Sequence, residues 1–288
     1  MAEPMTTYRS AEGVDERRRP PAAGADVVLA SAGPPRLGPA AFVRLVMHLT
    51  RRHLASSYHL TLLGWAWPVA RQLVQLAVLV FLFSQIFDLG IENYPVFVFI
   101  GLLSWTWLSS GVSSAATSLI QQRHLVNQPR LANSTLPVVA IAAPLVDLLF
   151  GVPILVVMLV LTEGLRVEAL ACIPLALVQL ALLTGLAWIV ASVSVMFRDV
   201  PNLVTVVLGV LFYLTPVFYG LRSVPDRFEW VLHLNPMTTL IEAYRHALLG
   251  TSAPSAGALA AVIAFSFAVA AGGFLLFRRL EPDFADHL

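Results

Sequence analysis

The sequence predicts an all-α integral membrane protein with six transmembrane helices. Of its 288 residues, 58% are hydrophobic and only 12% are charged, whereas about 25% of the residues in a soluble domain are charged. Six apolar segments are each long enough, at about 20 residues, to cross the ~30 Å hydrocarbon core of a bilayer. The predicted spans are residues 62–87, 94–119, 138–162, 169–196, 200–220 and 256–277, which together form one domain, residues 62–277.

The segment before the first span divides into two parts. Residues 1–38 are rich in Ala, Pro, Gly and charged residues and have no apolar period, which predicts a disordered cytoplasmic tail. Residues 39–61 carry apolar residues at helical spacing, and Arg44, Arg51 and Arg52 fall on the opposite face. This pattern predicts an amphipathic helix in the membrane interface, with an ordinary core-facing helix as the alternative.

The distribution of arginine gives the orientation. If the N-terminus lies inside the cell, more arginines flank the inner ends of the spans than the outer ends, as the positive-inside rule requires. Both termini are therefore predicted to be cytoplasmic, and residues 278–288 form a second cytoplasmic tail.

The only long connection between predicted spans, residues 221–255, then lies outside. Asn235 and Pro236 are typical of a helix start and Gly250 of a helix end, so a short helix is predicted from Pro236 to Leu249. Another short helix is predicted to start near Asp226. Backbone that does not span is tolerated at membrane depth only beside protein or a water-filled cavity. The loop is therefore expected to be re-entrant and to border a pathway as an outer gate. The predicted gate residues are Asn235, Pro236, Glu242, Tyr244 and Arg245, the last three forming a hydrogen-bonded brace.

Arg71 and Asp147 are charged residues well inside predicted spans, where charges are costly and usually paired or directed at a pathway. Each lies about nine residues past the inner end of its span, so both lie at a depth of about 13 Å. The sequence therefore predicts an intramembrane ion pair. The alternative is that each side chain reaches water separately.

Aromatic residues are dense in the first, second and fifth spans. Flat apolar sugar rings stack on aromatic side chains without tight binding, and a sliding substrate requires sites that it can leave. An interfacial aromatic belt and core packing are the alternative roles. The predicted substrate path comprises Trp65, Trp67, Phe81, Phe83, Trp105, Trp107, Phe212 and Tyr213.

Composition also excludes several functions. All eighteen basic residues are Arg, so the chain lacks the lysine that a phosphate-binding P-loop and Schiff-base chemistry both require. The single Cys cannot form a disulfide within the chain, and no histidines have metal-ligand spacing beside a carboxylate. The net charge of +1 does not suit a nucleic-acid partner. No enzyme activity, metal or cofactor is predicted for this chain.

Several stretches together carry a family resemblance that covers about residues 42–280. They are SYHLTLLGWAWPV (57–69), YPVFVFIGLLSWTWLSSGVSSAATSL (94–119), RDVPNL (198–203), FYLTPVFYGLRSVPDRF (212–228) and LNPMTTLIEAYRHALLG (234–250). In this order and spacing they resemble the permease subunits of type 2 ABC exporters of cell-surface polysaccharides, such as O-antigen, teichoic acid or a galactan. The match includes the Leu-Gly-x-x-Trp start of the first span and the Asn-Pro, Tyr-Arg and Gly signature of the last loop.

The resemblance implies a multi-pass transport subunit of the bacterial cytoplasmic membrane. Two copies of the chain would form a channel at their interface, and two copies of a separate ATPase would bind ATP and Mg²⁺ inside the cell. The substrate would be a polyprenyl-pyrophosphate-linked glycan, whose phosphate Arg44, Arg51 and Arg52 attract; holding the helix on anionic membrane lipids is their alternative role.

In such proteins the inner loop between spans two and three contacts the ATPase. Here RHLVNQPRLANSTLP (123–137) departs from the usual loop and keeps only its Leu-Pro end. The residues expected at this contact are Arg123, His124, Asn127 and Arg130. Two alternative functions stay open, an exporter of the same type for a drug or lipid, and a carrier or channel that works without an ATPase.

Overall fold

The computed structural model describes residues 44, 46–51, 67–86, 90–123, 133–162 and 164–287. Within these ranges the regular elements are helices, and no strand occurs. The predicted all-α class is therefore confirmed for the described part of the chain.

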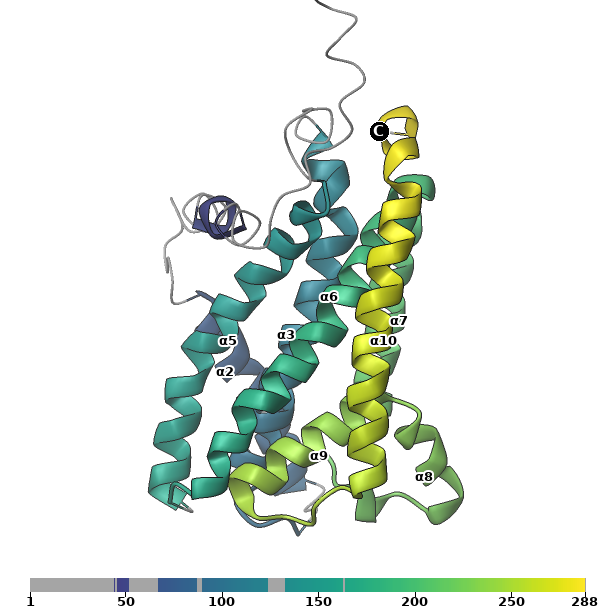
Figure 1. Ribbon diagram of the computed structural model, residues 1–288. Coiled ribbons are helices and arrows are strands. Elements are labelled where there is room, and N and C mark those ends of the chain that lie inside the picture. The colour runs from purple at the N-terminus through teal and green to yellow at the C-terminus, as the bar shows by residue number, and fades with distance from the viewer. Residues whose placement is uncertain are drawn as a thin grey trace, which may run out of the picture.

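Four long helices lie side by side and give the molecule its long axis (Figure 1). Each contains at least 25 residues and is therefore at least about 37 Å long at 1.5 Å per residue. All four are long and apolar enough to cross a membrane. They are α3 (Tyr94–Gln121), α5 (Thr135–Thr162), α6 (Cys172–Met196, preceded by the 3-10 helix η4, Val167–Ala171) and α10 (Ala256–Leu280).

Two further helices are apolar. The first covers the described part of the predicted span 62–87, whose residues 62–66 and 87 lie outside the described residues, and the second is shorter than its predicted span 200–220. α2 (Trp67–Val80) continues as a π-helix, η3 (Phe81–Ile86), and α7 runs from Val200 to Leu214. α7 ends before residue 220 because Thr215 precedes Pro216 and adopts an extended conformation, with φ −100° and ψ 135°. A residue before proline is disfavoured in helical geometry, so residues 215–220 leave the helix.

The lower end in Figure 1 carries the short helices α8 (Asp226–His233) and α9 (Pro236–Leu249), which follow the 3-10 helix η5 (Leu221–Ser223). The Asn235 side chain accepts a hydrogen bond of 3.0 Å from the backbone N–H of Met237 and caps α9. Gly250 ends α9 in the left-handed region, at φ 70°, where glycine carries no steric penalty. The predicted helix from Pro236 to Leu249 is confirmed at both ends.

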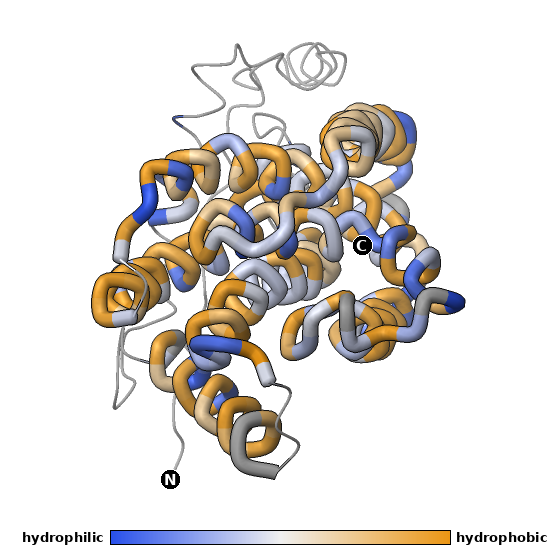
Figure 2. The backbone as a smooth tube through the Cα atoms, turned by 90° about the horizontal axis from the view of Figure 1, so that it is seen from below, coloured by the Kyte–Doolittle hydropathy of each residue, from blue (hydrophilic) through white to orange (hydrophobic). Residues whose placement is uncertain are grey.

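α3 is the central helix and is buried along most of its length. It contacts α2, α5, α6, α7 and α9, and its apolar residues form much of the main core. Seen from the α9 end, hydrophobic residues predominate along the long helices (Figure 2). This distribution suits helices whose outer faces meet lipid rather than water.

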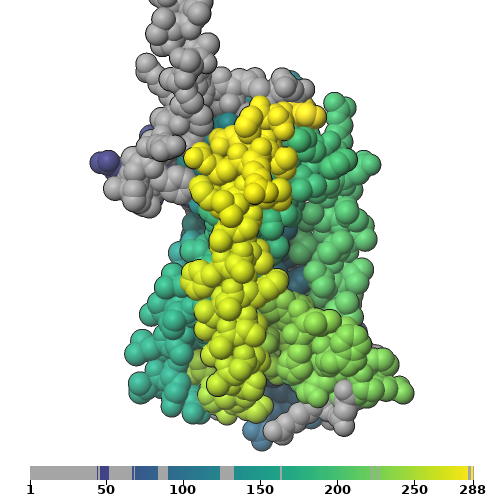
Figure 3. All heavy atoms as spheres, turned by 45° about the vertical axis from the view of Figure 1, so that its right-hand side comes forward, coloured from purple at the N-terminus to yellow at the C-terminus, as the bar shows by residue number. Residues whose placement is uncertain are grey.

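The backbones of α6 and α10 are in direct contact. A Cβ atom added to Gly273 would lie 2.4 Å from the carbonyl oxygen of Gly185, so the two backbones touch where both residues lack a side chain. α10 remains on the surface as a continuous column (Figure 3). Small residues permit such close approach between helices in membranes.

The upper end of the bundle has a core of its own. Phe284 of the short helix α11 (Phe284–His287) is fully buried and packs edge-on against Phe277 of α10, with the ring centroids 5.2 Å apart. The indole N–H of Trp188 donates a 3.0 Å hydrogen bond to the carbonyl of Ser134. The 3-10 helix η6 (Glu281–Asp283) connects α10 to α11. This second core comprises Leu119, Leu136, Ala191, Val195, Phe277 and Phe284.

Residues 44 and 46–51 are helical. In Figure 1 this purple segment is seen end-on, across the direction of the long helices, which is the orientation expected of a helix in the membrane plane. The rest of the predicted amphipathic helix, residues 39–61, and the predicted tail, residues 1–38, lie outside the described residues.

We expect Gly273→Ala to destabilise the protein by about 1–3 kcal/mol, because the new methyl group overpacks the contact with Gly185. Gly272→Ala is the matched control, since a Cβ atom there meets no other atom within 4 Å. The apparent Tm of the purified protein in detergent, followed by tryptophan fluorescence, should fall only for Gly273→Ala. Equal Tm values for the two variants would contradict the close backbone contact.

Candidate functional site

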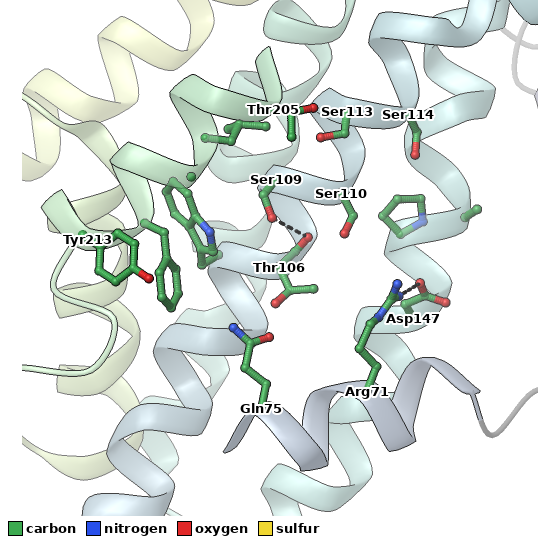
Figure 4. A pocket seen from close by; sticks show the side chains of 16 residues that line it. Arg71, Gln75, Thr106, Ser109, Ser110, Ser113, Ser114, Asp147, Thr205 and Tyr213 are labelled. Atoms are coloured by element: carbon green, nitrogen blue, oxygen red, sulfur yellow. Dashed lines mark hydrogen bonds and ion pairs between the residues drawn. The ribbon is translucent and has the colours of Figure 1, made fainter. Parts of the chain in front are cut away.

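A cavity of about 720 Å³ opens between α2, α3, α5 and α7 (Figure 4). We call it the polar groove. Hydroxyl, amide and charged side chains from all four helices point into it, and aromatic rings form one end. Its labelled lining residues include Arg71 and Gln75 from α2, Asp147 from α5, and Thr205 and Tyr213 from α7.

α3 supplies most of the hydroxyl groups of the polar groove. The hydroxyl residues are spaced so that they fall on one helical face, and all five are half-buried. The Ser109 hydroxyl lies 3.4 Å from the carbonyl of Thr106, so it can donate a hydrogen bond to its own helix and still accept one from a bound molecule. Sequence reasoning missed this stripe, although its spacing was visible. The stripe comprises Thr106, Ser109, Ser110, Ser113 and Ser114.

The structure brings Arg71 and Asp147 together at the wall of the polar groove. Nη2 of Arg71 lies 3.8 Å from Oδ2 of Asp147 (Figure 4), and Asp147 lies about 18 Å along α5 from its start. The Arg71 side chain is 57% exposed, whereas Asp147 is 15% exposed. The positive charge therefore faces the open side of the groove while the carboxylate is largely covered.

Three of the eight predicted path residues line the polar groove. The rings of Trp105 and Phe212 pack with centroids 6.1 Å apart, and Tyr213 meets Phe212 edge-on at 5.4 Å. Tyr213 is mostly exposed on α7. The groove thus combines aromatic faces with hydroxyl groups, a combination that suits weak contacts with polar rings.

The other described aromatic residues of the predicted path do not line this cavity. Trp107 is only 3% exposed and lines a separate apolar cavity beside α5 and α6. Phe83 stacks on Phe218, with centroids 5.1 Å apart. Trp67 and Phe81 lie exposed on the α2 and η3 surface.

A second set of polar contacts holds α9 against the bundle, and we call it the α9 brace. The buried Arg245 guanidinium donates from Nη1 to the carbonyl of Pro216 and from Nη2 to that of Val217, both at 2.7 Å. Its Nε donates to the carbonyl of Phe97 at 3.2 Å, and its Cζ lies 3.4 Å from the centroid of the Phe97 ring. Gly101 leaves room for this arrangement, because a Cβ atom there would lie 2.9 Å from Nη2.

Tyr244 and Asn235 complete the α9 brace. The Tyr244 hydroxyl donates to Oε1 of Gln179 at 3.1 Å, and the same glutamine donates to the carbonyl of Ser104 at 2.8 Å. The Asn235 amide donates to the hydroxyl of Thr215 at 2.7 Å. These contacts tie α9 to α3, to α6 and to the end of α7.

Glu242 lies apart from these hydrogen bonds. It lines a cavity of about 480 Å³ together with Arg245, but among the described residues no hydrogen bond or ion pair joins it to the α9 brace. Burial raises the pKa of the Glu242 carboxyl, and the charges of His233 and Arg245 oppose this shift. Burial also lowers the pKa of Arg245, which the Glu242 charge opposes. Glu242 therefore acts on Arg245 through its charge and not through a hydrogen bond of the brace.

The remaining predicted site residues lie elsewhere. Arg44 and Arg51 are exposed on the helical segment before α2, and Arg123 is exposed just beyond the end of α3. The described residues contain no group of three or more His, Cys, Asp or Glu side chains that could hold a metal ion. The predicted site residues outside the described ranges are Arg52, Trp65, His124, Asn127 and Arg130.

We expect Arg245→Lys to destabilise the protein by about 1–3 kcal/mol, because an ammonium group cannot reach all three carbonyls, and an unpaired buried carbonyl costs about that much. Arg227→Lys on α8 is the control, since that side chain is exposed and lies over the Phe228 ring. Thermal unfolding in detergent measures both. A lysine at position 245 that leaves the Tm unchanged would show that these contacts do not hold α9.

Comparisons with known proteins agree on the family. A family model described as ABC-2 type transporter matches residues 44–249, which is more than half of the chain. The O-antigen export system permease protein RfbA of Myxococcus xanthus is 28% identical over 247 residues, covering 85% of this chain and 95% of that protein. A protein of the same name from Klebsiella pneumoniae is 27% identical over 205 residues, covering 70% and 78%.

The inner membrane transport permease YadH of Escherichia coli strain K12 is 28% identical over 174 residues, covering 58% of this chain and 68% of that protein. The matched residues 44–249 contain α2, α3, α5 to α9, the polar groove and the α9 brace. This chain therefore belongs to the ABC-2 type transporter family.

Proposed function

We propose that this chain is the transmembrane subunit of an ATP-driven exporter that moves a lipid-linked polysaccharide across the bacterial cytoplasmic membrane. Two copies enclose a channel, and each contributes its polar groove as one wall. The observation that carries the proposal is an exposed, charged and hydroxyl-lined groove among apolar helices.

The exposure of Arg71 supports a partner at this face. An arginine facing hydrocarbon at mid-span costs about 2.5–3.5 kcal/mol or more, and more than half of the Arg71 side chain is exposed. α7, which forms another wall of the polar groove, has no buried residue in the single chain. A second copy and channel water would cover both features.

The chemistry of the polar groove suits a glycan. Hydroxyl groups on α3 can exchange hydrogen bonds with sugar hydroxyls, while Trp105, Phe212 and Tyr213 offer ring faces. Each contact is weak, so a long chain can slide past. The names of the relatives from Myxococcus xanthus and Klebsiella pneumoniae, which refer to O-antigen export, support this substrate class.

The proposed topology has six spans, with both termini inside the cell. α3, α5, α6 and α10 supply four spans, and we assign the other two to α2 with η3 and to α7. The α9 end of the bundle then lies outside, where the α9 brace holds an exit gate. The second core at α11 lies inside the cell.

Energy must come from a separate subunit, since the chain has no lysine for a P-loop. We assign two copies of an ATPase, which bind ATP and Mg²⁺, to the inner loop that carries Arg123, His124, Asn127 and Arg130. Arg44, Arg51 and Arg52 attract the pyrophosphate of the polyprenyl-linked glycan as it enters from the inner side.

A cysteine-labelling experiment tests whether the polar groove holds water. In a Cys172→Ser background, we expect Ser110→Cys to react with a hydrophilic maleimide in membranes, because its side chain faces the groove (Figure 4). Val157→Cys is the control, since it is exposed on α5 but lies outside the groove and faces lipid. Equal protection of both thiols would contradict an aqueous path.

A double-mutant cycle tests the role of the charge pair. Arg71→Ala and Asp147→Ala should each reduce glycan export in liposomes that contain the ATPase subunit, and the double variant should lose less than the sum. A coupling of about 0.5–3 kcal/mol is typical of residues in contact. Arg198→Ala, an exposed arginine outside the polar groove, is the control. Additive losses would contradict the pair, and export without any ATPase would contradict the proposed function.

A further inference from the structure

A second cavity, lined by apolar residues, lies between α3, α5, α6 and α9, on a different face of α3 from the polar groove. We call it the apolar crevice. Its volume is about 460 Å³, within the ~300–1,000 Å³ that ligand sites occupy. Leu148, Leu155 and Leu159 of α5 form one wall, and Ala176 of α6 lies on the other. The proposed function makes no use of this cavity.

The mouth of the apolar crevice faces the medium that surrounds the bundle. Ile173 and Leu177 on α6 are 63% and 60% exposed, and Leu149 on α5 is 59% exposed. These residues belong to helices that are long and apolar enough to span a membrane. At this depth the medium is therefore lipid hydrocarbon.

The polar atoms at the floor of the crevice are largely satisfied within the protein. Tyr244 donates to Gln179, Gln179 donates to the Ser104 carbonyl, and the Ser104 hydroxyl donates to the carbonyl of Ile100 at 3.1 Å. A buried water requires two to four polar partners, but among the lining residues only the indole N–H of Trp107 is a buried side-chain donor without a hydrogen-bond partner. Water is therefore a poor occupant, and an empty crevice would forfeit the dispersion contacts of its walls.

We infer that an acyl chain of a membrane phospholipid occupies the apolar crevice. When an acyl chain moves from the bilayer interior into the crevice, it passes between two apolar environments and loses no hydrophobic free energy. It also makes close contacts with the leucine side chains of the walls. A second copy of this chain fits the crevice less well, since the charged and hydroxyl-lined face that needs a partner lies at the polar groove.

The bound acyl chain reaches the α9 brace. Tyr244 and Leu248 of α9 line the apolar crevice beside α5 and α6 residues. An acyl chain there packs against the same tyrosine that ties α9 to Gln179, and so supports α9 from the lipid side. Only the description of α9 as a gate rests on the proposed function; the binding site does not.

Photolabelling tests the acyl-chain site directly. The full-length protein in nanodiscs is irradiated with a phosphatidylcholine that carries a diazirine near the end of one acyl chain, and adducts are mapped by mass spectrometry. We expect adducts on wall residues such as Leu155 and Ala176. Ala176→Phe fills the crevice and should reduce these adducts about tenfold, which corresponds to a loss of 1.4 kcal/mol of binding free energy.

Ala181→Phe is the matched control, because Ala181 is also half-buried on α6 but does not line the apolar crevice. Its adducts on Leu155 should equal those of the unaltered protein. If Ala176→Phe lowers the Tm so far that it does not fold, Leu155→Phe fills the crevice from α5 instead, with adducts read at Ala176.

Two results would overturn the inference. They are equal labelling of the crevice walls in the filled and control variants, and adducts confined to exposed rim residues. The labelling needs neither ATP nor glycan, so a failure of the proposed export function leaves this result unaffected.

Discussion

The buried guanidinium of Arg245 binds backbone carbonyls that have left the helix after the end of α7. When α7 ends at Leu214, the carbonyls of Pro216 and Val217 turn into the protein instead of continuing a helix. Buried carbonyls without partners cost free energy, and a lone buried charge costs more. Because the guanidinium donates to both carbonyls, neither the carbonyls nor the charge is left without a partner. The Phe97 carbonyl on α3 is a third acceptor. One side chain on α9 consequently connects α3 to the residues after α7, and the Tyr244 and Asn235 contacts add to this connection.

α3 separates two environments that the proposed transport cycle must keep apart. One face presents hydroxyl groups to the polar groove, and a neighbouring face presents apolar residues and Trp107 to the crevice that opens towards lipid. Trp105 and Trp107 show how sharply the division falls, since two residues along a helix differ by about 200° in direction. A polar substrate and the surrounding lipid can thus contact the same helix without meeting each other.

Sequence reasoning succeeded where the signal was local. The ends of α9 were predicted correctly because Asn235, Pro236 and Gly250 act within their own turns, and Arg71 and Asp147 were placed together because both positions could be read as depths. It failed where the partner of a side chain was a backbone carbonyl, and where the direction in which a side chain points from its helix decided which cavity it lines. Nothing in the sequence marks the Pro216 and Val217 carbonyls as the acceptors for Arg245, which lies 28 or more residues away. The path aromatics were chosen by density, so Trp107 was grouped with Trp105 although it packs on another face of α3.

The contact between Gly185 and Gly273 bears on how such a protein can move. Because the two backbones touch at these glycines, we expect α6 and α10 to move together as one rigid post. α7 has no buried residue and is joined to α9 by hydrogen bonds to the residues that follow its last turn. A change in groove width would therefore be taken up by α7 swinging about that junction, with the α6 and α10 post as the fixed frame of the motion.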